Sequence, residues 1–188
     1  MKIQYRKLAG VFEITLGPHE DERGFFMRVY DKSIFQKHNI DRIWVQENHS
    51  KSIKKGIIRG LHFQFPPYTE TKLVRCIRGA IFDVFVDLRK GSPTFGEWDY
   101  IILSEENNKM IYIPRGFAHG FCTLTEVSEV LYKVDNYYTP HAEGGIVWND
   151  ETIKIDWPVK NPILSDKDAR LPSFKEFVEK YGGLDVNF

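Results

Sequence analysis

Arg59-Gly60-Leu61-His62-Phe63-Gln64 is the stretch that decides the fold, together with a second one, Pro114-Arg115-Gly116-Phe117-Ala118-His119-Gly120. In the first stretch a strand-like run places His62 and Gln64 on one face, because side chains alternate along a strand. In the second, a Pro-Gly turn leads to His119. A histidine that no metal holds can move protons near neutral pH. The two stretches therefore favour acid–base chemistry.

The two stretches resemble the metal-binding motifs of cupins, in which an H-x-H pair, an acidic residue and a later histidine in a P-x-G-x-x-H turn hold the metal. The turn and His119 are intact, but Gln64 stands where the second histidine of the pair would be. The resemblance implies a cupin barrel without a metal or other cofactor. The rival interpretation is a metal-dependent cupin enzyme that uses His62, Glu70 and His119, with Gln64 as a weak ligand.

Most of the chain reads as short strands separated by turn residues. Eight segments are rich in Val, Ile, Phe and Tyr and are bounded by Gly, Pro, Asn or Ser: residues 43–46, 56–64, 72–77, 80–88, 98–103, 110–113, 120–124 and 130–135. Such a pattern predicts an all-β sandwich or jelly roll. The resemblance to cupins implies the jelly roll, as a cupin-type double-stranded β-helix. A few short peripheral helices are expected, over residues 31–38 and after a capping box that begins at Ser173.

Bulk properties limit the class of protein. The 188 residues suit one domain over residues 1–188. Charge is balanced, with 26 basic and 26 acidic residues, which gives no support to nucleic-acid binding. The basic cluster at residues 51–55 reads as a solvated loop, and Cys76 and Cys122 as buried thiols. No apolar run suits a signal peptide or the roughly 20 residues of a membrane span, so we expect a cytoplasmic protein.

Two local questions stay open at the level of sequence. Asp83 shares one strand face with Ile81 and Phe85, and that face either lines a wet pocket or points outward. Strict alternation places Arg59 and His62 on opposite faces, unless Gly60 marks a bulge that changes the register.

Several motifs, taken in order, resemble one family, the dTDP-4-dehydrorhamnose 3,5-epimerases, which are metal-free cupins that act on nucleotide sugars. The ordered match covers about residues 21 to 168. The motifs are Asp21-Glu22-Arg23-Gly24-Phe25-Phe26, Gln46-Glu47-Asn48-His49-Ser50, the Arg59 to Gln64 stretch, Lys72-Leu73-Val74-Arg75, Phe82-Asp83-Val84 with Val86-Asp87-Leu88-Arg89, Gly91-Ser92-Pro93-Thr94-Phe95-Gly96, the Pro114 to Gly120 turn, Leu131-Tyr132-Lys133, Trp148-Asn149-Asp150, Ile155-Asp156-Trp157-Pro158 and Leu164-Ser165-Asp166-Lys167-Asp168.

The resemblance implies a role for each matched position. His62 would be the general base, Asp168 its orienting carboxylate, Tyr132 the general acid on the opposite face of the sugar, and Lys72 the cation that stabilises the enolate. Substrate contacts are implied for a larger set: Arg23, Phe26, Gln46, Glu47, Asn48, Arg59, Lys72, His119, Tyr138, Glu143 and Lys167. A homodimer with exchanged N-terminal strands is also implied.

These residue types suit the chemistry. A C4 ketone makes the hydrogens on C3 and C5 acidic, so inversion needs a base on one face and an acid on the other. Histidine has an unperturbed pKa near 6.5, and an aspartate partner fixes its tautomer. A lysine near the C4 oxygen meets the developing negative charge. The reaction involves no redox change, so no nicotinamide is expected.

Two alternatives to a double epimerase stay open. One is an epimerase that inverts a single centre, or that acts on another nucleotide sugar; the other is a sugar-nucleotide-binding protein without catalysis. Arg28 departs from the family pattern, because many family members have an acidic residue at this position. This departure is the reason for the alternative of another nucleotide sugar. A cation there puts the preference for a thymine-type base in doubt.

Overall fold

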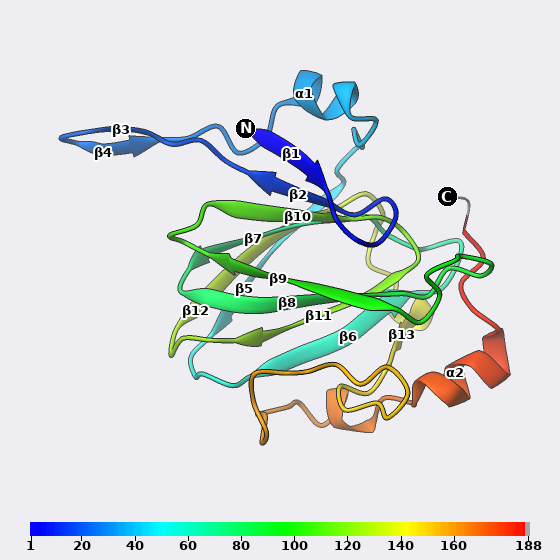
Figure 1. Ribbon diagram of the computed structural model, residues 1–188. Coiled ribbons are helices and arrows are strands. Elements are labelled where there is room, and N and C mark those ends of the chain that lie inside the picture. Colours follow the sequence, from blue (N-terminus) through cyan, green and yellow to red (C-terminus); the bar gives the residue numbers. More distant parts are fainter. Residues whose placement is uncertain (187–188) are drawn as a thin grey trace.

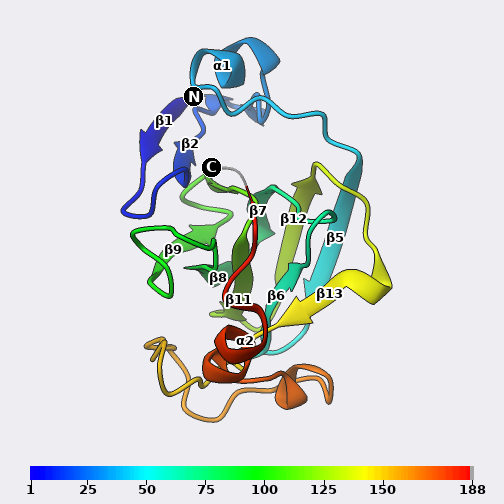
Figure 2. The ribbon, with the colours of Figure 1, turned by 90° about the vertical axis from the view of Figure 1, so that its right-hand side faces the viewer.

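Two antiparallel β-sheets face each other in the computed structural model, which describes residues 1–186 (Figures 1 and 2). One sheet has six strands in the order β1-β2-β10-β7-β12-β5, and the other has five in the order β13-β6-β11-β8-β9. The strands are β1 Lys2–Tyr5, β2 Phe12–Thr15, β3 His19–Asp21, β4 Gly24–Phe26, β5 Gln46–Ser52, β6 Ile58–Gln64, β7 Lys72–Arg78, β8 Ala80–Asp87, β9 Trp98–Ser104, β10 Lys109–Ile113, β11 Phe117–Thr123, β12 Ser128–Val134 and β13 Glu143–Gly145. The helical elements are α1 Lys32–Lys37, α2 Phe174–Tyr181 and two short 3-10 turns, η1 Pro140–Ala142 and η2 Asp168–Arg170. The predicted all-β jelly roll with short peripheral helices is confirmed.

One predicted strand was misplaced. Residues 43–46 were expected to form it, but β5 begins at Gln46 and continues to Ser52, and Ile43 is exposed. The sequence of β5 is almost wholly polar, because one face lines a wet pocket and the other faces solvent. It therefore lacks the apolar alternation that identifies a strand. For the same reason the expected solvated loop at residues 51–55 begins two residues late, since Lys51 and Ser52 still belong to β5.

Both faces of β8 are buried, although the polar residues on one face had left open that this face points outward. Ile81 and Phe85 point into the core between the two sheets, together with Val74 and Val130. The alternate residues of β8 pack outward beneath α2 and the segment 146–173, in the cluster that contains Phe177. Figures 1 and 2 show α2 on this side of the molecule and α1 on the opposite side, over the six-stranded sheet. Asp83 therefore faces inward.

The C-terminal helix forms where its capping box predicts. The Ser173 side chain accepts a hydrogen bond from the backbone N–H of Glu176, and the Glu176 side chain accepts one from the backbone N–H of Ser173. Gly182 ends the helix with a left-handed φ of 67°. Phe174 and Phe177 are buried against the sheet, which fixes the helix on the exterior of the barrel as expected. The predicted helix at 31–38 is also confirmed as α1, with Asp31 as its N-cap.

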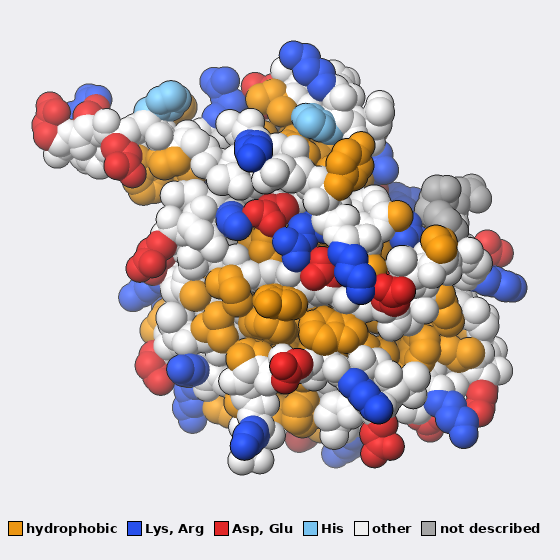
Figure 3. All heavy atoms as spheres, viewed as in Figure 1, with side chains coloured by type: hydrophobic (Ala, Val, Ile, Leu, Met, Phe, Trp, Pro, Cys, Tyr) orange, Lys and Arg blue, Asp and Glu red, His pale blue; other side chains and the backbone are white. Residues whose placement is uncertain are grey.

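Two exposed surfaces stand out around this frame. The β3–β4 hairpin projects away from both sheets (Figure 1), with Phe25 and Phe26 exposed. Hydrophobic side chains also gather across the face that carries β9 (Figure 3), where Tyr100 and Ile102 are the exposed members. Tyr100 is stacked on Phe82, with ring centroids 4.5 Å apart. In residues 1–186 no helix is both long and apolar enough to cross a membrane.

A buried ion pair ties the loop after β8 to the barrel. Arg89 donates two hydrogen bonds to Asp87, at 2.9 and 2.7 Å, and the hydroxyls of Ser92 and Thr94 donate to the same carboxylate. Burial raises the pKa of Asp87, but the hydrogen bonds from Arg89, Ser92 and Thr94 outweigh this effect and hold the pKa below its ordinary value. The carboxylate is therefore ionised at neutral pH.

We expect Asp87→Asn to lower the free energy of unfolding by about 3 kcal/mol at pH 7, because the neutral amide would remove the buried carboxylate that accepts hydrogen bonds from Arg89, Ser92 and Thr94. A depressed pKa contributes stability that is complete above about pH 4 and is lost as pH falls through the folded-state pKa. The difference between wild type and variant should therefore shrink at lower pH. Urea titrations between pH 7 and pH 3 measure it, and a constant difference would contradict this assignment.

Candidate active site

One pocket of about 500 Å³ opens between the sheets and is lined by half of the predicted site residues, including all four predicted catalytic residues. Its walls come from β5, β6, β7, β11 and β12 and from the segment 163–168. The predicted residues that line it are Arg59, His62, Lys72, His119, Tyr132, Lys167 and Asp168. Residues more than a hundred positions apart in the chain thus meet in one cavity.

His62 and Asp168 form a pair at the floor of the pocket. His62 Nε2 lies 2.6 Å from Asp168 Oδ1, and the backbone N–H of Gly60 donates to Asp168 Oδ2 at 3.2 Å. The Asp168 side chain is 6% exposed and that of His62 is 30% exposed, so the imidazole reaches the cavity and the carboxylate lies behind it. Burial raises the pKa of Asp168, but the hydrogen bond and charge of His62, with the bonds from Gly60 and Ser165, bring it below its ordinary value. An ionised Asp168 can orient His62 and stabilise its cation.

A change of register at Gly60 brings Arg59 and His62 into the same pocket. His119 is paired with His62 but Phe121 with Arg59, so three steps along β6 match two along β11. Gly60 has a φ of 105°, and a Cβ on it would lie 2.6 Å from the carbonyl oxygen of His119. Only glycine suits this position. The open question of the sequence is thus settled in favour of the bulge.

Tyr132 and Lys72 face His62 from the other sheet. Tyr132 lies on β12 and Lys72 on the neighbouring strand β7, where Lys72 is paired with Val134, two residues beyond Tyr132. The Lys72 ammonium is 5.8 Å from the centre of the Tyr132 ring and 2.9 Å from Glu70 Oε1. Tyr132 and Lys72 therefore line the cavity together, on the sheet opposite His62.

His119 is held by Asp83, a residue that the sequence did not assign to the site. His119 Nε2 lies 2.8 Å from Asp83 Oδ2, and Asp83 is completely buried. The second carboxylate oxygen, Oδ1, has no hydrogen-bond partner in the described residues. Burial raises the pKa of Asp83, and the charges of His119 and Lys72 act against that rise without cancelling it. The signal in the sequence was an acidic residue in the middle of an apolar strand.

We expect Asp83→Asn to reduce turnover at least about 10-fold, because it replaces the carboxyl group that contacts His119 Nε2, without lowering the free energy of unfolding at pH 7. A raised pKa means that the protonated form contributes stability, which is complete below about pH 4 and is lost as pH rises through the raised pKa. The variant has no such loss. Its stability relative to wild type should therefore increase from pH 4 to pH 8 in chemical unfolding, and a marked decrease would contradict the prediction.

The rim of the pocket is built by Tyr138, Glu143 and Lys167. The Tyr138 hydroxyl donates to Glu143 Oε2 at 3.1 Å, and Lys167 forms an ion pair with the same carboxylate. Gln46 Oε1 accepts a hydrogen bond from the backbone N–H of Tyr138 at 2.6 Å. These four predicted substrate contacts are therefore adjacent to one another and to the pocket. Tyr138 is 55% exposed, which leaves its ring free to contact a ligand.

Three of the predicted substrate contacts, Glu47, Arg23 and Phe26, lie away from the pocket. Glu47 points to the exterior of β5, where Oε2 lies 3.0 Å from Lys133 Nζ. Arg23 and Phe26 lie on the projecting β3–β4 hairpin, and Arg23 forms hydrogen bonds with Asp21 there. Asn48 is next to the site, since it is paired with Tyr132 in the β5–β12 ladder. Within one chain, the hairpin residues do not reach the cavity.

The donor set of the metal-dependent alternative is not assembled. Across residues 1–186, no three His, Cys, Asp or Glu side chains are grouped so that they could hold a metal ion. Glu70 pairs with Lys72, His119 with Asp83 and His62 with Asp168, while Gln64 is used in hydrogen bonds to the backbone. Sequence reasoning named Gln64 and Glu70 only as metal ligands and missed these roles.

This arrangement defines a class of protein. A histidine bound to a buried carboxylate on one sheet, opposite a tyrosine and a lysine on the facing sheet, suits an isomerase that inverts a carbon by proton transfer. The family model for dTDP-4-dehydrorhamnose 3,5-epimerase matches residues 5–176, and the chain belongs to that family.

Relatives and solved structures agree with this membership. The enzyme of that name from Shigella flexneri is 53% identical over 155 residues, which cover 82% of this chain and 85% of the relative. The crystal structure of the Bacillus anthracis enzyme, with TDP and PPi bound, has a TM-score of 0.90 at 45% identity and covers 92% of this chain and 99% of that one. A Legionella pneumophila structure in complex with dTDP-4-keto-L-rhamnose has a TM-score of 0.92 at 37% identity and covers 100% and 99% of the two chains.

Proposed function

We propose that the chain is an epimerase that converts dTDP-4-dehydro-6-deoxy-D-glucose to dTDP-4-dehydro-L-rhamnose by inverting C3 and C5. The observation that carries the proposal is the placement of His62, with Asp168 behind it, and Tyr132 on facing sheets of one pocket. A sugar ring between the sheets would then have a base on one face and an acid on the other. The family names of the relatives support the same reaction.

The proposed reaction is a proton exchange through an enolate. His62 takes the proton from the carbon next to the C4 ketone, and the electron pair of the C–H bond passes to the C4 oxygen. The Lys72 ammonium stabilises that oxygen. Tyr132 returns a proton to the opposite face of the carbon as the enolate collapses, and both groups are reset by exchange with solvent. The second centre is inverted in the same way.

The side chains that line the pocket suit a diphosphate. Arg59, Lys167 and His119 line the cavity with the reacting groups, and a guanidinium binds phosphate oxygens in a bidentate manner. Tyr138, at the rim, offers an exposed ring for stacking on the base. We propose that the sugar occupies the floor between His62 and Tyr132, and that the nucleotide extends to the rim at Tyr138.

A homodimer would complete this site. Arg23 and Phe26 are implied substrate contacts, yet the hairpin that carries them projects away from both sheets (Figure 1), and neither residue lines the pocket. We propose that the hairpin of each chain reaches the pocket of a second copy, in a two-fold dimer. Both cysteines are free buried thiols, which supports a reducing, cytoplasmic setting. We also propose that residues 1–188 form one domain.

Proton NMR of the reaction in deuterated buffer tests the function. The substrate is dTDP-4-keto-6-deoxyglucose, and deuterium at both C3 and C5 of the product would support the double epimerase. Label at one position only would indicate the single-centre alternative. Binding of the substrate without any label would contradict the proposed function, and Arg28 would then be the first residue to exchange for glutamate.

Mixing two inactive variants tests the shared site. Arg23→Ala lacks the hairpin contact and His62→Asn lacks the base, so a mixed dimer contains one site with both residues intact. Random mixing of a two-fold dimer should restore about a quarter of wild-type activity. No recovery, in a mixture that sedimentation shows to be dimeric and exchanged, would contradict the hairpin exchange.

A further inference from the structure

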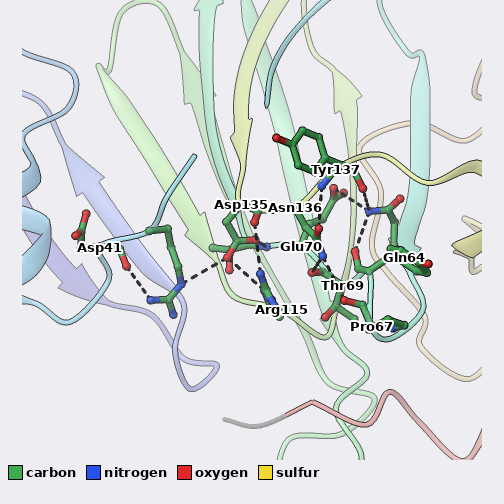
Figure 4. A network of polar contacts seen from close by, with 12 residues as sticks. Asp41, Gln64, Pro67, Thr69, Glu70, Arg115, Asp135, Asn136 and Tyr137 are labelled. Atoms are coloured by element: carbon green, nitrogen blue, oxygen red, sulfur yellow. Dashed lines mark hydrogen bonds and ion pairs between the residues drawn. The ribbon is translucent and has the colours of Figure 1, made fainter. Parts of the chain in front are cut away.

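Gln64 stands where the cupin metal motif has its second histidine, and here its amide holds protein backbone. The side chain is 3% exposed and makes four hydrogen bonds. Oε1 accepts from the backbone N–H of Thr139 at 2.6 Å, and Nε2 donates to the carbonyls of Tyr68 and Tyr137 at 2.9 and 3.2 Å and to Glu70 Oε2 at 3.3 Å. Figure 4 shows this network at one end of the barrel.

The partners fix the orientation of the amide. A backbone N–H can only donate and a backbone carbonyl can only accept, so Oε1 must face Thr139 and Nε2 must face Tyr68 and Tyr137. No other side chain of this length supplies an acceptor and two donors in this arrangement. Glutamate could accept from Thr139 but could not donate to the two carbonyls, and it would also face Glu70.

The backbone that Gln64 holds is the segment that carries Tyr138. Gln64 binds the carbonyl of Tyr137 on one side and the N–H of Thr139 on the other, while Gln46, from the other sheet, binds the N–H of Tyr138 itself. Two glutamines from facing sheets thus fix three consecutive residues. Asn136 adds hydrogen bonds to the carbonyls of Pro67 and Thr69, which joins the segment to the β6–β7 connection.

The same amide is also connected to the reacting end of the pocket. Its Nε2 donates to Glu70 Oε2, and Glu70 Oε1 lies 2.9 Å from the Lys72 ammonium. Glu70 and Lys72 side chains are each 11% exposed, so this chain of contacts is largely shielded from solvent. Gln64 therefore lies between the segment at the rim and the lysine at the floor.

We propose that Gln64 is a positioning residue that orders residues 137–139 as the wall that recognises the nucleoside diphosphate end of the substrate. The proposal rests on the proposed function, in which Tyr138 meets the base. Gln64 does not touch the substrate in this scheme; it acts through the backbone of Tyr137 and Thr139. An ordered segment binds more tightly because its conformational entropy is already lost before the ligand arrives.

The test is the affinity of Gln64→Met for dTDP, measured by titration calorimetry, together with steady-state kinetics on the dTDP-sugar. Methionine keeps the length and volume but loses all four hydrogen bonds. We expect the Kd for dTDP and the KM to rise at least about 10-fold, and kcat at saturation to stay within about 3-fold of wild type. A role in folding alone would lower the unfolding temperature and leave the Kd of the folded variant unchanged.

Asn107→Leu is the matched control. Asn107 also uses its whole amide to hold backbone, accepting from Ser104 and Lys109 and donating to Ile102, in the β9–β10 turn away from the pocket. This control should lose stability and keep the Kd for dTDP. If Gln64→Met does not fold, Gln64→Glu, which keeps the bond from Thr139, is measured in its place with the same expected rise in Kd.

The outcomes separate the two proposals. Suppose that the wild-type protein turns over the sugar and binds dTDP, and that a folded Gln64 variant has a Kd for dTDP within about 2-fold of wild type. That result would overturn the inference about Gln64 and leave the proposed function intact. A wild-type chain that neither binds dTDP nor turns over the sugar would overturn both. A fall in kcat with an unchanged Kd would also overturn the inference, because it would place the effect on Lys72.

Discussion

His62→Asn is expected to lose turnover by about 10³-fold, in the range typical of a single proton-transfer residue, while it binds dTDP as wild type does. Asparagine is polar and smaller than histidine, so it should fit the pocket, although it does not extend as far as Nε2 does toward Asp168. Its amide cannot accept a proton near neutral pH. Deuterium exchange at C3 and C5 should fall together with epimerisation, because both begin with the same C–H cleavage. Proton NMR in deuterated buffer and calorimetry with dTDP measure these effects.

His49→Asn is the control for this variant. His49 Nε2 also contacts a carboxylate, Glu129 Oε2 at 2.9 Å, but on the exterior of β5, where the His49 side chain is 50% exposed. Its turnover should equal that of wild type. If His62→Asn binds dTDP and still turns over at the wild-type rate, the base is another group and the proposed mechanism is wrong.

The residues that we propose as reacting groups could be named from the sequence because each lies within a short local motif. His62 follows an Arg-Gly-Leu run, Lys72 opens an apolar strand, and Tyr132 lies between Leu131 and Lys133. The strands that carry them are also apolar enough to be recognised, which explains why β6, β7, β8 and β12 were predicted close to their observed bounds. Local pattern and local chemistry agree at these positions.

Other features depend on contacts between distant segments, and sequence periodicity carries no trace of them. β5 is polar on both faces, so only its pairing with β12 identifies it as a strand. The partners of Asp83 and Gln64 are 36 and 75 residues away along the chain, which hides their roles in holding His119 and Thr139. A bulge at Gly60 was foreseeable from the sequence, but the resulting shift in the pairing of β6 could be known only from its register with β11.

The location of Arg23 and Phe26 shows a further limit. The family resemblance of their motif implies that they contact substrate, but a motif does not say which chain's substrate they would contact. The hairpin residues do not line the pocket of their own chain, so any substrate contact that they make would be in the pocket of another chain. The mixing experiment tests whether the hairpin occupies the pocket of a partner chain.

Tyr132→Phe is expected to separate proton removal from proton return. Phenylalanine keeps the ring beside Lys72 and removes only the hydroxyl, so His62 can still abstract a proton and form the enolate. Without the acid, reprotonation occurs from the side of His62 and restores the original configuration. We therefore expect deuterium to enter the unreacted substrate while product formation falls at least about 10²-fold.

Tyr100→Phe, on the outer face of β9, is the matched control and should behave as wild type, because Tyr100 contacts Phe82 through its ring. The decisive quantity is the ratio of deuterium incorporation into substrate to product formed, which should rise in Tyr132→Phe and remain at the wild-type value in the control. Equal losses of exchange and epimerisation would instead mean that Tyr132 acts in the first proton transfer. In that case the assignment of base and acid to the two facing sheets would have to be reversed.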